Sequence, residues 1–328
     1  MRKYWTSFTI VLVVILLAAC GGGEETTDTE LTDVTLVLDW TPNTNHTGIY
    51  VAEENGYFEE QGINVDIIMP GESGPEQTVA SGQAEFAISA QETVTEARVQ
   101  DIPIVSIGAI IQHNTSGFAA PTEYGITSPK DFAGKKYGGW GAPVEAAVID
   151  SLMKQEDASV EDVEIINIGN TDFFTAIKRD IDFAWIYYAW TGIEAELRGE
   201  DLDMLYLTDY SDKLDYYTPV IITSEELISE QDQVVAAFMK AISDGYQFAI
   251  ENPDEAADIL VNHVPDLDSE LVHASQEWLS PKYQDDADRW GVQSEDIWQN
   301  YADWMYENEL IDSELDVKSA FTNEFIPE

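Results

Sequence analysis

Residues 34–58 read VTLVLDWTPNTNHTGIYVAEENGYF, and this stretch decides the fold class. Residues 34–38 are rich in β-branched and aliphatic side chains, which predicts a strand. A turn sequence with Pro42 follows at residues 39–43, and residues 47–55 predict a helix that stops at Gly56. A strand, a turn and a helix in this order form the first unit of an α/β fold.

The same alternation of strand and helix continues along the chain, and it predicts parallel sheets with helices on both faces. Two α/β units follow one another, residues 220–222 form an extended return segment, and the chain is mostly helical from residue 229 onward. We therefore expect two lobes with a ligand cleft between them, and we expect the helical tail to pack on the first lobe. Further strands are expected at residues 64–69, 84–89, 102–111, 135–138, 163–168, 181–186 and 204–207.

The N-terminus has the order of a bacterial export signal. Arg2 and Lys3 precede an apolar segment at residues 8–17, and Leu17-Ala18-Ala19-Cys20 follows. Cys20 is the only cysteine, which excludes a disulfide within the chain and suits a lipidated thiol. The alternative is a transmembrane anchor, but the apolar segment is shorter than the roughly 20 residues that a span needs.

These features predict the domain organisation. We expect a signal peptide at residues 1–19, a lipidated flexible tether at 20–30, a first lobe at 31–120 plus 224–328, and a second lobe at 121–223. The 63 acidic residues against 15 Lys and Arg give a net charge of −48, which repels nucleic acid and anionic lipid headgroups. We therefore expect no nucleic-acid partner, membrane contact through the lipid anchor only, and a monomer.

Five loops should face the cleft, because ligands of open α/β sheets lie beyond the carboxyl ends of the strands. None of these loops contains Lys or Arg, and together they contain several aromatic and acidic residues. Aromatic faces allow stacking, and carboxylates accept hydrogen bonds from nitrogen donors. The composition favours a flat, neutral or cationic, nitrogen-rich ligand such as an aminopyrimidine. The loops are residues 39–46, 89–93, 112–116, 138–145 and 185–194.

The candidate ligand-binding residues come from these loops, and each also has a structural interpretation. Asp39 and Asn43 could act as turn formers or caps, Trp190 could cover a helix start, and Trp185 is expected in the core more than in the site. Tyr187 or Tyr188 should face the cleft, and we favour Tyr188. The candidates are Asp39, Trp40, Asn43, Gln91, Glu92, Trp140, Glu145, Tyr188 and Glu194.

No catalytic or metal-binding motif accompanies these candidates. The histidines His46, His113, His263 and His273 do not form an HExxH pattern, and the sequence contains neither a P-loop nor GxSxG. We predict no catalytic residue, no metal, no cofactor and no enzymatic activity.

Two segments resemble a known family. Residues 38–52, LDWTPNTNHTGIYVA, followed by Gly56-Tyr57-Phe58 and Gln61-Gly62-Ile63, resemble the opening of the thiamine-pyrimidine branch of the periplasmic solute-binding proteins. Residues 128–136, SPKDFAGKK, resemble the second-lobe entry of many such receptors. Within the branch, the chain resembles the formylaminopyrimidine-binding proteins of thiamine-salvage ABC importers.

The resemblance implies a type II periplasmic-binding fold that holds a pyrimidine between its lobes, with an ABC permease and an ATPase as partners. The signal, Cys20 and the tether predict a lipid-anchored position at the extracytoplasmic face of the cell membrane. Asp39 and Trp40 match the family's pyrimidine-contacting turn, and Tyr188 and Glu194 match its second-lobe segment. One alternative is an enzyme of the same fold that makes the pyrimidine from its own histidine and pyridoxal phosphate, although the chain lacks that enzyme's cysteine-rich motif. The other is a receptor for a sulfonate, riboflavin or another small solute.

Overall fold

The structure is a computed structural model that describes residues 31–169 and 171–328. The predicted signal peptide, the tether and Cys20 lie outside the described residues. Among the described residues, no helix combines the length and the apolar character that a membrane span requires.

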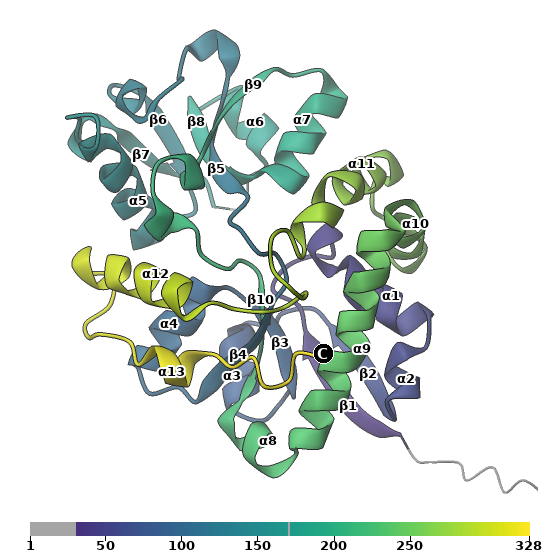
Figure 1. The fold of residues 1–328 in the computed structure, drawn as a ribbon. Helices are drawn as coiled ribbons and strands as arrows, with labels where there is room; N and C mark the ends of the chain where they lie inside the picture. The colour runs from purple at the N-terminus through teal and green to yellow at the C-terminus, as the bar shows by residue number, and fades with distance from the viewer. Residues whose placement is uncertain (1–30, 170) are drawn as a thin grey trace, which may run out of the picture. The chain divides into compact units, whose positions relative to one another are not determined.

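Within the described residues, the strands form two five-stranded sheets, each at the centre of one lobe (Figure 1). The order of the first sheet is β2-β1-β3-β10-β4, and the order of the second is β7-β6-β8-β5-β9. The two-lobed α/β prediction is confirmed. The strands are β1 (Thr32–Val37), β2 (Ile63–Ile68), β3 (Phe86–Ser89), β4 (Ile104–Ala109), β5 (Ser116–Pro121), β6 (Lys136–Gly139), β7 (Glu164–Asn167), β8 (Phe183–Tyr187), β9 (Leu202–Tyr206) and β10 (Val220–Ser224).

Both sheets are mixed, so the prediction of wholly parallel sheets was wrong. β10 runs antiparallel to β3 and β4, and β5 runs antiparallel to β8 and β9. Each of these two strands is the first after the chain passes from one sheet to the other, so no helical crossover fixes its direction as it does in a βαβ unit. The return segment at residues 220–222 is therefore a central strand, buried on both faces.

Helices cover both faces of each sheet. Helices α1 and α9 bury Ile49 and Phe238 against Leu36 of the first sheet, whereas α4 and α12 lie on its other face (Figure 1). The helices are α1 (Thr47–Glu54), α2 (Tyr57–Glu60), α3 (Gly74–Ala80), α4 (Gln91–Val99), α5 (Pro143–Lys154), α6 (Phe173–Ile177), α7 (Ile193–Arg198), α8 (Glu225–Glu230), α9 (Asp232–Glu251), α10 (Pro253–His263), α11 (Ser269–Leu279), α12 (Glu295–Glu307) and α13 (Val317–Ala320).

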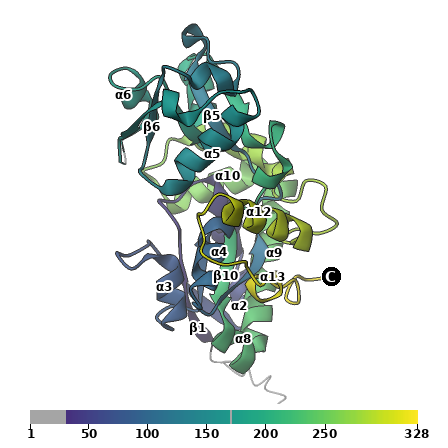
Figure 2. The same ribbon diagram turned by 90° about the vertical axis from the view of Figure 1, so that its left-hand side faces the viewer.

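Helix α12 packs on both lobes, although the tail was expected on the first lobe alone. Trp298 lies in the core cluster of the first sheet, whereas Tyr301 and Met305 lie in the cluster of the second sheet. The indole nitrogen of Trp304 donates to Ser151 Oγ of α5 at 3.3 Å. Figure 2 shows α12 close to α5 and to α4. The end of the chain thus connects the two lobes beside the cleft.

Candidate functional site

A cavity of about 640 Å³, which we call the central cleft, lies between the two lobes. Its lining comes mainly from segments at the carboxyl ends of β1, β3, β6 and β8. All five loops predicted to face the cleft contribute at least one lining residue. The loop at residues 112–116, which connects the two sheets, contributes Thr115. This outcome follows from the α/β arrangement, because strand ends with the same direction open at one edge of a sheet.

The residue 39–46 loop is fixed by a buried histidine. The backbone N–H of Asn43 donates to His46 Nδ1 at 3.2 Å, so the ring proton lies on Nε2. Nε2 donates to Asp39 Oδ1 at 2.8 Å, and His46 is fully buried. Asn43 also caps the turn, because its Oδ1 accepts from the backbone N–H of Asn45. The loop therefore presents Asp39 to the cleft in one orientation, with the carboxylate one-third exposed.

Two buried tyrosines hold the same loop from the first lobe. Tyr283 Oη donates to the carbonyl of Thr44 at 2.5 Å, and Tyr246 Oη donates to the carbonyl of Asn45 at 2.6 Å. Burial raises the pKa of both tyrosines above the ordinary value, so they remain neutral donors. The loop is thus preorganised before any ligand arrives.

Three aromatic side chains line the central cleft with their rings accessible. Trp40 is 55% exposed, Trp140 is 48% exposed and Tyr187 is 43% exposed. Burial of its hydroxyl end raises the pKa of Tyr187 to about 12, although a hydrogen bond with Thr218 opposes the shift. Three exposed aromatic rings gathered in one cleft offer stacking faces to a flat ligand.

The charged lining of the central cleft is acidic. Asp39 and Glu76 line it, and Glu76 accepts a hydrogen bond from Ser89 Oγ. Among the described residues, no Lys, Arg or His belongs to the lining. A site for phosphate, sulfonate or carboxylate usually supplies a basic side chain. The cleft is better suited to a ligand that donates hydrogen bonds from nitrogen.

A match to a protein-family model shows the family to which this chain belongs. The model of the family described as NMT1/THI5 like matches residues 43–256, which include most of the cleft lining. The chain belongs to the NMT1/THI5-like family.

Relatives in this comparison include both a binding protein and an enzyme. The chain is 29% identical to the formylaminopyrimidine-binding protein of Halalkalibacterium halodurans, over 90% of this chain and 91% of the relative. It is 26% identical to the 4-amino-5-hydroxymethyl-2-methylpyrimidine phosphate synthase of Legionella pneumophila, over 90% of this chain and 92% of the relative. Membership of the family therefore does not by itself separate binding from synthesis.

Solved structures confirm the fold. The alkanesulfonate-binding protein SsuA from Xanthomonas axonopodis pv. citri superimposes with a TM-score of 0.66 at 12% identity, covering 89% of this chain and 99% of that one. The predicted type II periplasmic-binding-protein fold, with two lobes and a cleft between them, is the fold of this NMT1/THI5-like chain.

Four predicted ligand-binding residues line the central cleft together: Asp39, Trp40, Asn43 and Trp140. Glu145 lies behind the lining, where its buried carboxylate accepts from Tyr137 Oη at 2.8 Å and from the backbone N–H of Trp140 at 3.0 Å. It also accepts from the next two backbone N–H groups, both at 2.6 Å. A Cβ at Gly139 would lie 1.7 Å from this carboxylate, so a larger residue there would displace the Glu145 side chain from its hydrogen bonds. Glu145 shapes the loop that carries Trp140.

Gln91 and Glu92 also lie outside the lining. Gln91 is fully buried, accepts from the backbone N–H of Tyr217 at 2.9 Å and donates to the carbonyl of Ile297 at 3.3 Å. Glu92 faces Tyr301 Oη at 3.4 Å, and burial, reinforced by the charge of Glu96, raises the pKa of Glu92 to about 7. Gln91 therefore has a structural role, because it connects α4 to the segment before β10 and to α12.

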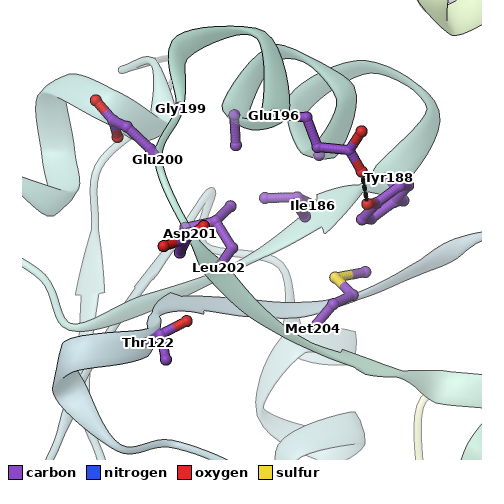
Figure 3. A pocket seen from close by; sticks show the side chains of 11 residues that line it. Thr122, Ile186, Tyr188, Glu196, Gly199, Glu200, Asp201, Leu202 and Met204 are labelled. Atoms are coloured by element: carbon purple, nitrogen blue, oxygen red, sulfur yellow. Dashed lines mark hydrogen bonds between the residues drawn. The ribbon is translucent and has the colours of Figure 1, made fainter.

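Tyr188 and Glu194 belong to the second lobe away from the central cleft. Tyr188 lines a separate hollow of about 400 Å³, where its hydroxyl donates to Glu196 (Figure 3). Glu194 forms an ion pair with Arg198 on α7. The expectation that Tyr188 faces the central cleft was wrong, because a π-helical turn, η5 (Tyr188–Gly192), begins directly after β8 and ends the alternation of the strand.

The cleft contains residues that the sequence interpretation did not place there. Tyr187 takes the position expected for Tyr188, Trp190 and the largely buried Trp185 also line the cleft, and Glu76 contributes the second carboxylate. The tyrosine pair and both tryptophans were visible in the residue 185–194 loop. Glu76 carried no signal, because it lies in the first turn of α3 rather than directly after a strand.

One group of side chains outside the cleft lining has the composition of a metal site. His113, Asp285 and Asp286 have potential ligand atoms within 4.8 Å of one another. His113 already contacts Asp215 through Nδ1 at 2.7 Å and Asp286 through Nε2 at 3.1 Å. These carboxylates, led by Asp215, raise the pKa of His113 to about 9, so the protonated imidazole forms ion pairs with them at neutral pH. The group acts as an ion-pair cluster beside the crossings between the sheets.

Proposed function

We propose that this chain is an extracytoplasmic lipoprotein that binds a thiamine-precursor pyrimidine, N-formyl-4-amino-5-aminomethyl-2-methylpyrimidine, for an ABC importer in thiamine salvage. The observation that carries the proposal is the chemistry of the central cleft, where the exposed Trp40 and Trp140 accompany the oriented carboxylate of Asp39. The part of the lining that the structure describes contains no Lys or Arg. The name of the Halalkalibacterium halodurans relative supports the choice of ligand.

In this proposal, the pyrimidine ring stacks on Trp40 and on Trp140 or Tyr187. The exocyclic amine of the ring donates to the Asp39 carboxylate, whose other oxygen is already occupied by His46. Asn43 stabilises the loop and contributes polar lining. A stacked ring with a paired amine has both of the contacts that this cleft offers, a π-face and an acceptor.

Delivery to the importer follows from the two-lobed fold. The open lobes admit the ligand, closure buries it, and the permease of the ABC importer receives the closed form. Cys20 would carry the lipid that retains the protein at the outer face of the membrane, with residues 20–30 as a tether. The partners are then the permease and its ATPase, and the net charge of −48 argues against a nucleic-acid partner.

A thermal-shift panel with the full-length protein tests the ligand. The panel contains the formylaminopyrimidine, the aminomethyl and hydroxymethyl pyrimidines, thiamine, riboflavin and taurine. A ligand at about 100 times its Kd adds about 2.7 kcal/mol to the free energy of unfolding, so the true ligand raises the Tm by several degrees. Stabilisation by the pyrimidines supports the proposal. Stabilisation by riboflavin or taurine alone contradicts it.

The synthase function of the Legionella pneumophila relative is the competing function. Incubation of the protein with pyridoxal phosphate, followed by mass spectrometry of the intact chain and of released pyrimidines, distinguishes the two. An unchanged mass and no pyrimidine product are expected of a receptor. Loss of mass at a histidine, with release of a pyrimidine, would establish synthesis instead.

A further inference from the structure

Ser275 connects the two walls of the central cleft although it does not belong to the lining. Its hydroxyl lies 2.6 Å from the hydroxyl of Thr44 and donates to the carbonyl oxygen of Ala189. Thr44 lines the cleft from the first lobe, and Ala189 lines it from the second. Ser275 itself is fully buried on α11. One side chain therefore contacts both lobes directly behind the site.

The direction of this hydrogen-bond chain follows from the number of protons. The hydroxyl proton of Ser275 is used by the carbonyl of Ala189, so the hydroxyl of Thr44 must donate to Ser275 Oγ. Removal of the Ser275 hydroxyl leaves Thr44 without its acceptor and the Ala189 carbonyl without its donor. Both groups are buried, so neither loss is compensated by bulk water.

The first-lobe end of this hydrogen-bond chain, at Thr44, is held in place by further hydrogen bonds. The carbonyl of Thr44 accepts from the buried Tyr283, and the carbonyl of the next residue accepts from Tyr246. Thr44 also belongs to the loop in which His46 orients Asp39. The position of Thr44 is thus a fixed reference for the carboxylate wall of the cleft.

The second-lobe end is the π-helical turn η5. Ala189 packs in the hydrophobic cluster of the first lobe, and Trp190 packs against the same cluster. The first residue of η5, Tyr188, has its ring centroid 5.2 Å from that of Trp278. Trp278 lies on α11, three residues after Ser275. The turn directly follows Tyr187, which carries the exposed ring in the cleft. Its position sets where the second-lobe aromatic residues stand.

We infer that Ser275 is a positioning residue that sets the spacing between the Asp39–Trp40 wall and the Tyr187–Trp190 wall of the central cleft. A ligand that stacks on one wall and pairs with the other depends on this spacing, so affinity depends on a side chain that does not touch the ligand. The inference rests on the proposed function only for the identity of the ligand, since the hydrogen bonds through Ser275 do not depend on which flat ligand occupies the cleft.

The test compares Ser275→Ala with Ser280→Ala in the full-length protein. Ser280 is a matched control, because it is also buried and also donates to a carbonyl, that of Ala249 at 2.9 Å, but its contacts remain in the first lobe. Both variants should lose similar stability. Calorimetry with the formylaminopyrimidine should show a rise in Kd of about tenfold for Ser275→Ala and of less than about twofold for Ser280→Ala. The rise should come mainly from faster dissociation.

Equal effects of the two variants on Kd, or an unchanged Kd for Ser275→Ala, would overturn the inference. Thr44→Val provides a second test if Ser275→Ala does not fold, because it removes the hydroxyl that donates to Ser275 at the first-lobe end of the hydrogen-bond chain. If the hydrogen bonds from Thr44 through Ser275 act as a unit, the Thr44→Val, Ser275→Ala double variant should have about the same Kd as the single variant with the higher Kd. Additive losses of binding free energy would contradict the inference. If the wild type binds another flat ligand of the panel, the proposed function fails, but the same comparison still tests Ser275 with that ligand.

Discussion

His46 and Asp39 are joined by a hydrogen bond of 2.8 Å in which the buried imidazole Nε2 is the donor and the carboxylate Oδ1 is the acceptor. The tautomer is fixed by the backbone N–H of Asn43, which donates to Nδ1. The carboxylate that we propose as the ligand's acceptor is therefore oriented by a residue that the ligand does not reach. A short loop at the end of a strand thus contains both a recognition group and its support.

We expect His46→Leu to weaken both folding and binding. The substitution leaves the partly buried backbone N–H of Asn43 without an acceptor, so the free energy of unfolding should fall by about 2 kcal/mol in urea titrations. The freed Asp39 should also bind the formylaminopyrimidine at least about fivefold more weakly by calorimetry. His263→Leu is the control, because His263 contacts Glu54 at 2.9 Å outside the cleft lining. A similar loss of affinity in that variant would show that the effect is not specific to the loop.

Trp40→Ala and Trp140→Ala should lower affinity without lowering stability. Both rings are about half-exposed, so their removal costs little in the folded state. Each contributes a stacking face, and loss of one aromatic contact should cost more than about 1 kcal/mol of binding free energy, or roughly fivefold in Kd. Tyr306→Ala is the matched control, since this ring on α12 is 44% exposed but does not line the cleft. Unchanged affinity in Trp40→Ala by calorimetry removes that residue from the site.

Tyr187→Leu and Tyr188→Leu distinguish the two neighbouring tyrosines. The first removes an aromatic ring from the central cleft, and the second replaces a ring in the separate hollow with another apolar side chain (Figure 3). We expect a rise in Kd of about fivefold for Tyr187→Leu and of less than about twofold for Tyr188→Leu. The opposite result would restore the expectation from strand alternation.

The loops of the site could be predicted from sequence because their positions depend on the direction of the strands. Asp39 and Trp40 follow a strand whose apolar character is clear, Trp140 follows the strand expected at residues 135–138, and all three residues line the cleft. Tyr188 was placed wrongly because strand alternation holds only while the strand continues, and here the strand ends in a π-helical turn that packs against α11. Pattern alone gives no sign of such a turn.

Other errors came from contacts that the sequence pattern does not show, some within one loop and some between segments far apart in the chain. In the sequence, Glu145 is an acidic residue near the start of a helix that follows a cleft loop, so it was predicted to bind the ligand. In the structure, four donors already form hydrogen bonds with its carboxylate. Ser275 carries no signal at all, since a serine within a helix has no distinctive pattern. Its role follows from Thr44 and Ala189, which are 231 and 86 residues away. Sequence order cannot supply these partners without the fold.

We expect His113 to make stability depend on alkaline pH. Its contacts with Asp215 and Asp286 raise the pKa of His113 to about 9, above the ordinary value of about 6.5. The stabilisation is therefore fully present below about pH 6.5 and is lost as the pH rises through about 9. Because the side chain is 38% exposed, solvent screening reduces the effect to about 1 kcal/mol. Urea unfolding from pH 6 to 10 should show this loss in the wild type relative to His113→Asn; parallel curves contradict the prediction.

Glu92→Gln should stabilise the protein above neutral pH. Burial, assisted by the charges of Glu96 and Glu145 and opposed by the hydrogen bond from Tyr301, raises the pKa of Glu92 to about 7. The cost of ionising this carboxyl in the folded state is absent below the ordinary value of about 4.3 and is complete above pH 7. A neutral amide avoids that cost, so the variant should exceed the wild type by about 1 to 2 kcal/mol in urea unfolding at pH 8 and match it at pH 4. Exposed Glu123→Gln serves as the control and should show no such pH-dependent gain. Equal stability of Glu92→Gln and the wild type at pH 8 would mean that Glu92 ionises without penalty behind the cleft.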